Sequence, residues 1–393
     1  MGNPVIVEAG RTPIGKRNGW LSAVTAPYLL AEAQFGVLER AGVAPEDVDQ
    51  LIGGCVTQAG QQASNVTRNA WLSRGVDFTA AATTIDCQCG SAQQANNFMA
   101  GLIATGGARI GIACGVEQMS QIPLGTAAQA QGLGGYYKDE RWPWKDEAKT
   151  QFEMAERIAE MRGFAKQDLD ELGVLSQERA AKAWAEGRFE REVIPVDAPQ
   201  RDKEGNLTGE VMTVNRDQGL RETTLESLAN LKPVLEGALH TAGTSSQISD
   251  GAAAVLWMDE DEARARGIRP RARITYHTMV GTDPFYGLDG PAHATQKMLD
   301  QTKYSITDFD VFECNEAFAS VFLSWESVHK IPREKANVNG GAIALGHPVG
   351  STGARLITTA LHELERIDGE LAMVTMCQGG SLGICTVLER LPG

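Results

Sequence analysis

The sequence predicts a layered α/β protein built from two related halves. Segments that read as buried strands alternate with segments of helical periodicity, a pattern typical of a mostly parallel sheet covered by helices. A strand-and-helix unit recurs about 260 residues later, since residues 47–55 resemble residues 308–315. The strand ending at Cys114 likewise resembles the strand ending at Cys377. Over residues 119–245 the alternation is interrupted, which predicts an inserted lid between the halves.

The first half contains five segments of clear pattern. They are a buried strand over 4–9, a helix over 28–41, a strand over 50–55, a helix that follows Cys89 and runs to Ala104, and a strand over 108–114 that Gly115 closes. Together they make the first layered unit.

The inserted segment has a different character. After Ser120 it becomes rich in Gly, Gln, charged and aromatic residues, as in Gly132–Tyr137. Helical patterns dominate residues 152–184, and Asp202–Asn206 is typical of a hairpin turn. Lids of this kind commonly bind the remote part of a substrate.

The layered pattern resumes after the lid. A run of small residues over 249–258 predicts a helix that leads into a strand, and another strand begins at Arg271, just beyond Pro270.

Composition excludes several classes of protein. The 393 residues are 42% apolar and 22% charged, which is ordinary globular composition with two or three core-forming units. A net charge of −14 argues against nucleic-acid binding, so an anionic ligand needs local basic residues. Seven cysteines without paired zinc spacing predict no metal site and favour a reducing cytoplasm. No signal peptide or membrane-length apolar run is found, so we expect a cytoplasmic protein without membrane partners.

Cys89 is the first candidate catalytic residue. It stands at the start of a predicted helix, beside the small residues Gly90 and Ser91. The positive end of the helix dipole would lower the thiol pKa and favour a nucleophilic thiolate. The alternative is simple packing, because free cysteines are commonly buried. Cys87 lacks the Gly-Ser setting and is interpreted as structural.

The second half supplies three further candidates. The glycine-dense loop 337–355 holds His347, which could act as a base or donate to an oxyanion. Cys377 ends a strand and is followed by Gly379, whose backbone N–H suits an oxyanion hole. Asn315 ends the strand related to 50–55 and could hold a water or a carbonyl. Taken alone, each could instead be a turn, capping or packing residue.

Five motifs in this order resemble the thiolase superfamily of acyl-CoA acyltransferases over nearly the whole chain. They are Arg11–Lys16, Cys89–Ser91, Asn315–Phe318, Gly346–Pro348 and Cys377–Gly380.

The resemblance implies a fold and a division of the chain. The fold is a duplicated βαβαβαββ unit in five α-β-α-β-α layers with an inserted loop domain. Residues 1–118 with 246–266 would form the N-terminal domain, 119–245 the CoA-binding loop domain and 267–393 the C-terminal domain. The opening residues and the context of Cys89 are most similar to actinobacterial thiolases of steroid side-chain breakdown.

The resemblance also implies the catalytic roles. Cys89 matches the acyl-accepting nucleophile, His347 the residue that activates it, and Cys377 the acid/base that acts on the acetyl carbon and the CoA thiol. His347 with a water held by Asn315 would form one oxyanion hole. The N–H groups of Cys89 and Gly379 would form the other. Such chemistry needs two pockets, because charge develops first on a carbonyl and then on an enolate.

Arg221, Ser227 and Ser246 are the implied CoA contacts, with ordinary surface polarity as the alternative. Over residues 151–156 the chain departs from short-chain thiolases, since Glu153 stands where these have a histidine. The loss of that histidine is compatible with a bulkier acyl group.

We therefore expect a 3-ketoacyl-CoA thiolase, with CoA as a substrate and no cofactor, that associates as a homodimer or homotetramer. Three alternatives stay open: biosynthetic acetoacetyl-CoA formation, a ketoacyl synthase, which Cys377 argues against, and a non-catalytic acyl-CoA-binding paralogue.

Overall fold

The computed structural model describes residues 2–127 and 140–392. The stretch Gly132–Tyr137 of the inserted segment lies outside the described residues. None of the helices in the described ranges combines the length and the apolar character that a membrane crossing requires.

The strands are β1 Pro4–Arg11, β2 Gly15–Lys16, β3 Gln50–Gly54, β4 Ala81–Ile85, β5 Ile110–Gln118, β6 Val196–Arg201, β7 Leu207–Val214, β8 Ser249–Asp259, β9 Ala272–Gly281, β10 Val311–Cys314, β11 Leu371–Gln378 and β12 Leu382–Arg390. The helices are α1 Ala26–Ala41, α2 Val66–Leu72, α3 Ser91–Ala104, α4 Gln151–Arg162, α5 Lys166–Ala185, α6 Leu225–Ala229, α7 Glu260–Ala265, α8 Gly290–Gln301, α9 Ala319–His329, α10 Ala342–Leu345 and α11 Thr352–Ile367. Single 3₁₀ turns lie at Pro45–Asp47, Gly60–Gln62, Ile306–Asp308 and Arg333–Lys335.

In the described part of the chain, nine strands follow one another in a single continuous sheet, and β2 adds to it by pairing with β8. Its two parts, one from each half of the chain, are here called the first and second sheets. The first half has the order β4-β3-β5-β8-β1, and the second half has the order β10-β11-β12-β9. A single pair, Ile6 with Ala272, joins β1 to β9. The small sheet β6-β7 stands apart. Parallel and antiparallel strands are therefore mixed in each half.

The duplication extends to strand register. Gln50 of β3 pairs with Gly111 of β5, and Val311 of β10 pairs with Ala372 of β11, both in parallel. Each residue of the second pair lies 261 positions after its counterpart in the first. The expected repeat is confirmed. The expected match between the strand ends at Cys114 and Cys377 is wrong by two residues, because at this spacing Cys377 corresponds to Val116.

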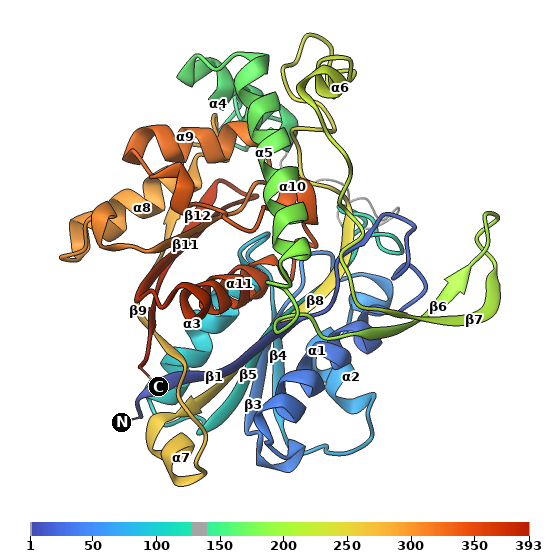
Figure 1. Ribbon diagram of the computed structural model, residues 1–393, viewed down its shortest axis with the longest axis vertical. Coiled ribbons are helices and arrows are strands. Elements are labelled where there is room, and N and C mark those ends of the chain that lie inside the picture. Colours follow the sequence, from blue (N-terminus) through green and yellow to red (C-terminus); the bar gives the residue numbers. More distant parts are fainter. Residues whose placement is uncertain (1, 128–139, 393) are drawn as a thin grey trace.

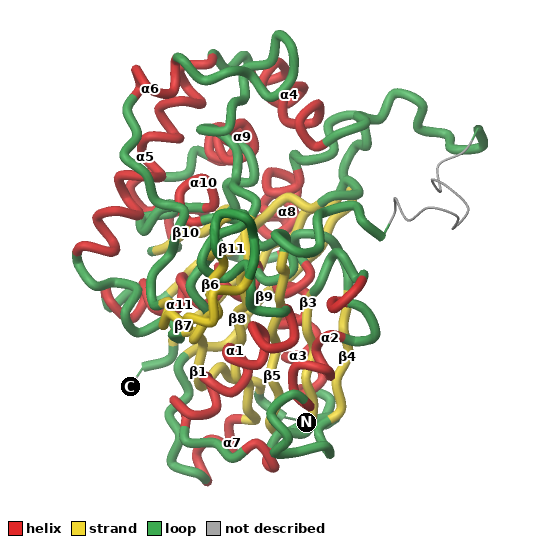
Figure 2. The backbone as a smooth tube through the Cα atoms, turned by 90° about the vertical axis from the view of Figure 1, so that its right-hand side faces the viewer, coloured by secondary structure: helices red, strands yellow, loops and turns green. Residues whose placement is uncertain are grey.

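Three buried apolar clusters hold five layers together. One packs α1 and α2 on the first sheet, with Trp71 as its largest side chain. The second lies between the sheets and contains side chains of α3 and α11, such as Met99 and Leu361. The third packs α8 and α9 on the second sheet around Trp325. Figure 1 shows α3 and α11 side by side in the middle, and Figure 2 shows the strands running behind the helices. The expected five-layer α/β fold is confirmed.

Two sequence expectations about strands are wrong. β5 does not close at Gly115 but continues to Gln118, because Gln118 still pairs with Asp250 of β8. Residues 249–258 contain no helix, because β8 is paired with β1 on one side and with β5 on the other. Small residues suit such a doubly covered central strand.

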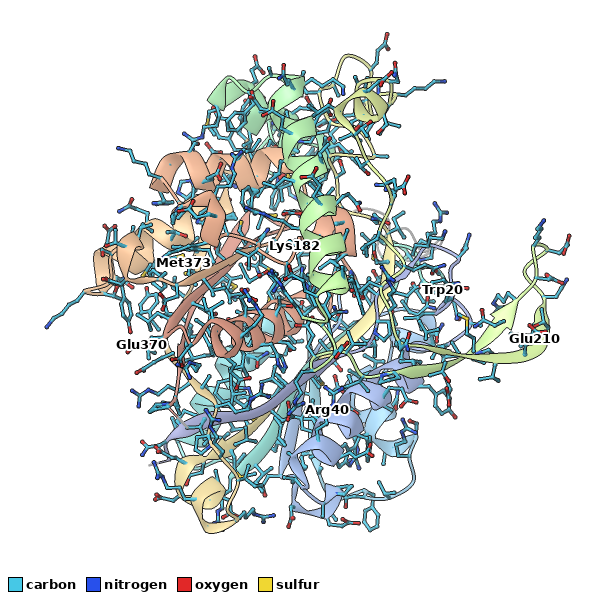
Figure 3. All side chains as sticks on the ribbon, viewed as in Figure 1. Trp20, Arg40, Lys182, Glu210, Glu370 and Met373 are labelled. Carbon is cyan, nitrogen blue, oxygen red and sulfur yellow. The ribbon has the colours of Figure 1, made fainter. Side chains whose placement is uncertain are left out.

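The inserted segment contains the expected helices α4 and α5 and a hairpin. The turn between β6 and β7 closes where Asp202 N–H donates to Asn206 O and Gly205 N–H donates to Asp202 O. Figure 1 shows this hairpin projecting from the layers, and Figure 3 places the exposed Glu210 on it. The division into three domains stays a prediction.

Candidate active site

Cys89 lies in a tight turn between β4 and α3. Ser91 shapes that turn, because its hydroxyl accepts a hydrogen bond from Cys87 N–H at 2.9 Å and donates one to Gln88 O at 2.6 Å. Gln88 has a positive φ of 57°, which few side chains adopt, so the backbone is sharply bent there. The bend places Cys89 directly before the first turn of α3.

The expectation of a lowered thiol pKa at Cys89 is wrong. Burial raises its pKa to about 11 and outweighs the N–H groups of Gly379 and of Cys89 itself, which point to the sulfur. The carboxyl groups of Glu117 and Asp86 add to the rise. Since a buried charge is costly without a partner, the resting group is the neutral thiol. Its activation therefore requires a base.

The end of β11 packs against the Cys89 turn from the other half of the molecule. Gln378 Nε2 donates to Cys87 O at 2.8 Å, and a Cβ at Gly90 would come within 1.9 Å of that nitrogen. A larger residue at position 90 would therefore displace the side chain of Gln378. The neighbouring Cys377 is 1% exposed, and burial raises its pKa well above the ordinary value, with the nearby Cys89 thiol adding to the rise. The two thiols therefore share one buried site.

His347 is held in one tautomer. Thr352 Oγ1 donates to Pro348 O at 3.0 Å, so it accepts from Nδ1–H of His347 at 2.7 Å. Nε2 of His347 is then unprotonated, and it accepts from Asn315 Nδ2 at 3.3 Å. Nε2 therefore carries the lone pair that a base needs, and Asn315 Nδ2 must release it before it can take a proton.

Burial keeps this imidazole neutral. Burial, together with the smaller effect of the positive charge of Arg355, lowers the pKa of His347 to about 3. Asn315 is fully buried, and its Oδ1 has no hydrogen-bond partner among the described residues. Such an oxygen is suited to accept a hydrogen bond from an ordered water.

Thr352 and Glu117 are two site residues that the sequence analysis missed. Glu117 accepts hydrogen bonds from the backbone N–H groups of Val56, Thr57 and Gly350, and burial raises its pKa. It thereby ties the glycine-dense loop of the second half to the first half. The only sequence signal for Glu117 was its position, next to Gln118 and shortly after the predicted strand 108–114.

A cavity of about 550 Å³ lies near the Cys89 turn, although neither thiol is among its lining residues. Its lining includes Gln88 and Gly379, which flank the thiols, and on the lid side Trp144, Gln151 and Met154. Volumes of this size hold drug-sized molecules. The cavity therefore has room for a large group next to Cys89.

Two sequence models of known families match the chain. The model described as "Thiolase, N-terminal domain" matches residues 4–261, and "Thiolase, C-terminal domain" matches residues 268–390. The chain belongs to the thiolase family. It is therefore an acyltransferase, as its relatives' names also indicate.

The curated relatives of this thiolase span several named activities. A steroid 3-ketoacyl-CoA thiolase FadA6 of Mycobacterium tuberculosis is 41% identical over 392 residues, covering 98% of this chain and 94% of that protein. A 3-ketoacyl-CoA thiolase of Vibrio vulnificus is 39% identical and covers 99% of this chain and 100% of that protein. The crystal structure of the Bacillus anthracis acetyl-CoA acetyltransferase has a TM-score of 0.89 at 34% identity, covering 100% of this chain and 99% of that one.

The three residues expected to contact CoA in this thiolase lie in different surroundings. Ser246 is half-buried, and its N–H donates to Ala317 O at 2.9 Å, next to Asn315. Arg221 is exposed, with its Nη2 donating to Ala242 O at 3.2 Å. Ser227 is exposed and caps α6, where its hydroxyl donates to Thr224 O. Their role in binding CoA stays a prediction.

Of the lid residues that depart from short-chain thiolases, some form hydrogen bonds within the lid and others line the cavity. Glu153 Oε2 accepts from Lys149 N–H at 2.7 Å, whereas Gln151 faces the cavity. One turn later, Glu156 Oε1 accepts from the buried His240 Nδ1–H at 2.5 Å, and His240 Nε2 accepts from Ser320 N–H. These bonds hold α4 against α9 and so fix one wall of the cavity.

Proposed function

We propose that this thiolase cleaves a 3-ketoacyl-CoA with a bulky acyl group, releasing acetyl-CoA and an acyl-CoA shortened by two carbons. Cys89, His347, Cys377, Asn315 and Gly379 carry the reaction.

In the first step His347 Nε2 takes the proton of the Cys89 thiol, and the sulfur attacks the 3-keto carbon. The resulting oxyanion accepts hydrogen bonds from the N–H groups of Cys89 and Gly379, which already point to the sulfur region. A base is required, because burial raises the pKa of Cys89 to about 11. Since burial also lowers the pKa of His347 to about 3, the proton moves while the sulfur attacks and not beforehand.

In the second step the bond between carbons 2 and 3 breaks. The acyl group stays on Cys89, and the electron pair passes to the acetyl-CoA enolate. Nε2–H of His347 and a water on Asn315 Oδ1 stabilise the enolate oxygen, and Cys377 protonates carbon 2. The same imidazole nitrogen thus serves first as base and then as donor.

In the third step the Cys377 thiolate takes the proton of an incoming CoA thiol. The CoA sulfur attacks the acyl-Cys89 thioester, and Cys89 leaves and recovers its proton from His347. Both cysteines are then restored, so no metal or redox cofactor takes part.

The observation that carries this proposal is the meeting of Cys89, Cys377 and Gly379 in one buried site. The electrostatic effect of Cys89 on Cys377 and the Gly379 N–H at the Cys89 sulfur both require close approach.

The bulky acyl group is supported by the cavity of about 550 Å³ and by the named relatives, among them a steroid 3-ketoacyl-CoA thiolase. The biosynthetic direction is the second candidate, favoured by the relatives named acetyl-CoA acetyltransferase. Cytoplasmic location and a homodimer or homotetramer complete the proposal.

Thiolysis of acetoacetyl-CoA should be compared with that of a bicyclic 3-ketoacyl-CoA, with intact-mass spectrometry of the protein in each reaction. We expect the higher kcat/KM with the bicyclic substrate and an acyl adduct on Cys89. A preference for acetoacetyl-CoA would favour the biosynthetic candidate. CoA-ester binding without any adduct would identify a non-catalytic paralogue and refute the proposal.

A further inference from the structure

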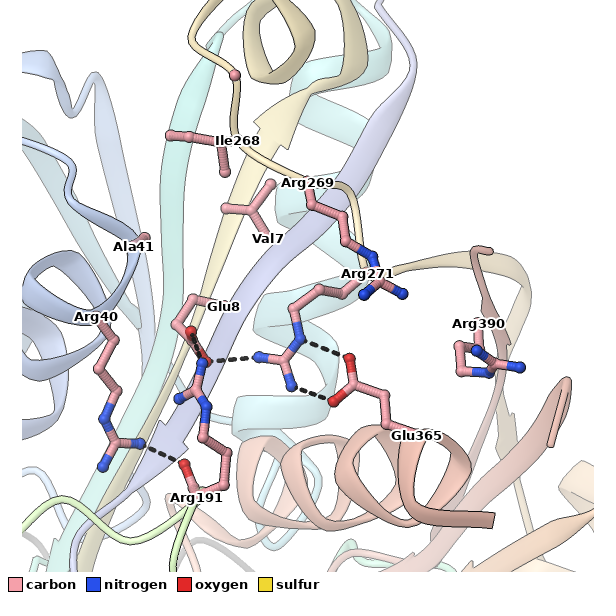
Figure 4. A pocket seen from close by; sticks show the side chains of 11 residues that line it. Val7, Glu8, Arg40, Ala41, Arg191, Ile268, Arg269, Arg271, Glu365 and Arg390 are labelled. Carbon is pink, nitrogen blue, oxygen red and sulfur yellow. Dashed lines mark hydrogen bonds and ion pairs between the residues drawn. The ribbon is translucent and has the colours of Figure 1, made fainter. Parts of the chain in front are cut away.

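A cleft of about 600 Å³ lies away from the cysteines, where the two halves meet along β1 and β9. Arginines from several elements enter it (Figure 4). Its charged lining consists of five arginines and two glutamates: Arg40, Arg191, Arg269, Arg271, Arg390, Glu8 and Glu365. A local formal charge of +3 in a protein of net charge −14 is a strong local concentration of positive charge.

The internal ion pairs occupy only part of this positive charge. Arg271 Nη1 donates to Glu8 Oε1 at 2.6 Å, and its Nε and Nη2 bind Glu365. Arg191 reaches the other oxygen of Glu8 at 2.6 Å while its side chain stays 54% exposed. The two glutamates are therefore already engaged.

Arg269 is exposed and makes no hydrogen bond or ion pair with any other residue of the described ranges, although its charge acts on Glu365. Arg40 is bound only to carbonyl oxygens, those of Arg191 and Val193. Burial lowers the pKa of Arg40, and the charge of Arg191 lowers it further. The attraction of Glu8 and Glu39 offsets the repulsion of Arg40 by Arg191 and Arg271 only in part.

The shape of the cleft narrows the class of ligand. Guanidinium groups bind phosphate oxygens in a planar, two-pronged manner. Arg390 Nη2 is already paired with Asp368 Oδ1 at 2.5 Å, so two excess charges remain. A single carboxylate would neutralise one of them, whereas a diphosphate matches both. Val7, Ala41 and Ile268 add an apolar wall on which a flat ring could lie (Figure 4).

We propose that this cleft binds a diphosphate group, either inorganic or carried by a nucleoside. Arg269 and the exposed part of Arg191 hold the phosphates, and the apolar wall accepts the base of a nucleotide.

Isothermal titration calorimetry of the full chain tests the site with pyrophosphate, ADP and adenosine. We expect one site for pyrophosphate and for ADP, and none for adenosine. Tighter binding of ADP would identify the nucleotide as the source, and equal binding would identify the inorganic anion. Failure of both phosphates to bind would overturn the proposal.

Substitutions of single arginines test where on the protein the anion binds. Arg269→Ala breaks no hydrogen bond of the described fold and should raise the Kd about tenfold, since a charged hydrogen bond is lost. Arg264→Ala removes an exposed arginine on α7 and is the matched control, with an unchanged Kd. If Arg269→Ala binds normally while Arg221→Ala does not, the anion occupies the predicted CoA site and the proposal is wrong.

Discussion

The two halves of this thiolase share one arrangement of strands, here called the frame, and differ at the positions that carry the proposed chemistry. In the first half Asp49 Oδ2 accepts from the N–H groups of Arg109 and Ile110, at the start of β5. In the second half Asp310 Oδ2 accepts from the corresponding N–H groups at the start of β11. Such identical local bonding shows that the frame tolerates new side chains without changing register.

The differences appear when equivalent positions, 261 residues apart in the sequence, are compared at the ends of these strands. Val116 of β5 corresponds to Cys377 of β11, and both are buried. Gly54 corresponds to Asn315, which binds His347. The first half thus has a valine and a glycine, neither of which can react or form a side-chain hydrogen bond, where the second half has a thiol and an amide. Function in this fold depends on those few substitutions.

The largest expected effect separates the two cysteines. Cys89→Ala should lose at least about 10⁴-fold in kcat and form no acyl adduct, because the nucleophile is gone. Cys377→Ala should lose about 10³-fold, because only proton transfer is removed. Steady-state thiolysis and intact mass measure both. Cys385→Ala, a buried cysteine of β12, is the control and should keep wild-type turnover.

The central helices differ in their response to acid. α3 carries no ionisable side chain, whereas α11 carries the buried His362, whose Nε2–H donates to Ala9 O. Burial lowers the pKa of His362 to about 4, so the folded protein binds this proton more weakly than the unfolded chain. Above pH 6.5 His362 is neutral in both states, so the unfolding free energy is at its full value. As the pH falls from 6.5 to about 4, the unfolded chain binds the proton first and the unfolding free energy falls by ~3 kcal/mol.

His362→Gln keeps a donor for Ala9 O and should flatten this part of the pH profile of unfolding free energy, as measured by urea denaturation. If the unfolding free energy of the variant falls as steeply between pH 6.5 and 4 as that of the wild type, His362 of α11 does not cause the acid sensitivity.

Thr352 tests the fixed tautomer of His347. Thr352→Val removes the acceptor for Nδ1–H and should lower kcat about 10- to 100-fold, as for other residues that orient a catalytic imidazole. Thr352→Ser restores the hydroxyl and should recover most of the activity. Equal activity of the valine and serine variants would refute this role.

The smallest effect tests the equivalence of the two frames. Asp49→Ala and Asp310→Ala each leave two backbone N–H groups without their carboxylate, at a cost of about 1–2 kcal/mol in unfolding free energy. Thermal unfolding should show the two losses to be similar. A loss confined to one variant would break the correspondence.

Much of this frame could be predicted from sequence, because it depends on local pattern. The helix after Cys89 ends at Ala104 as expected, and the hairpin turn at Asp202–Asn206 is confirmed. The end of β5 could not be predicted, because residues 116–118 continue the strand only through pairing with β8. The same pairing explains why the small residues of β8 form a strand throughout.

Motif order predicts the residue types of the candidate site, and their catalytic roles stay a prediction, whereas its electrostatics could not be predicted. Motif order identified Cys89, His347 and Cys377. The dipole argument for Cys89 failed because burial depends on contacts from β11, which lie far away in the sequence. The hydrogen bond of Thr352 to the imidazole likewise depends on how the loop folds back, five residues after His347.

The central claim is that the thiols of Cys89 and Cys377 lie together in one buried site, and a short bifunctional reagent tests it most directly. Dibromoacetone should be added to a Cys87→Ser variant, which removes the half-buried neighbouring thiol. We predict one three-carbon bridge per chain, located by peptide mass spectrometry between residues 89 and 377 and prevented by prior acylation of Cys89. Separate single adducts on the two cysteines, with no bridge, would contradict the account.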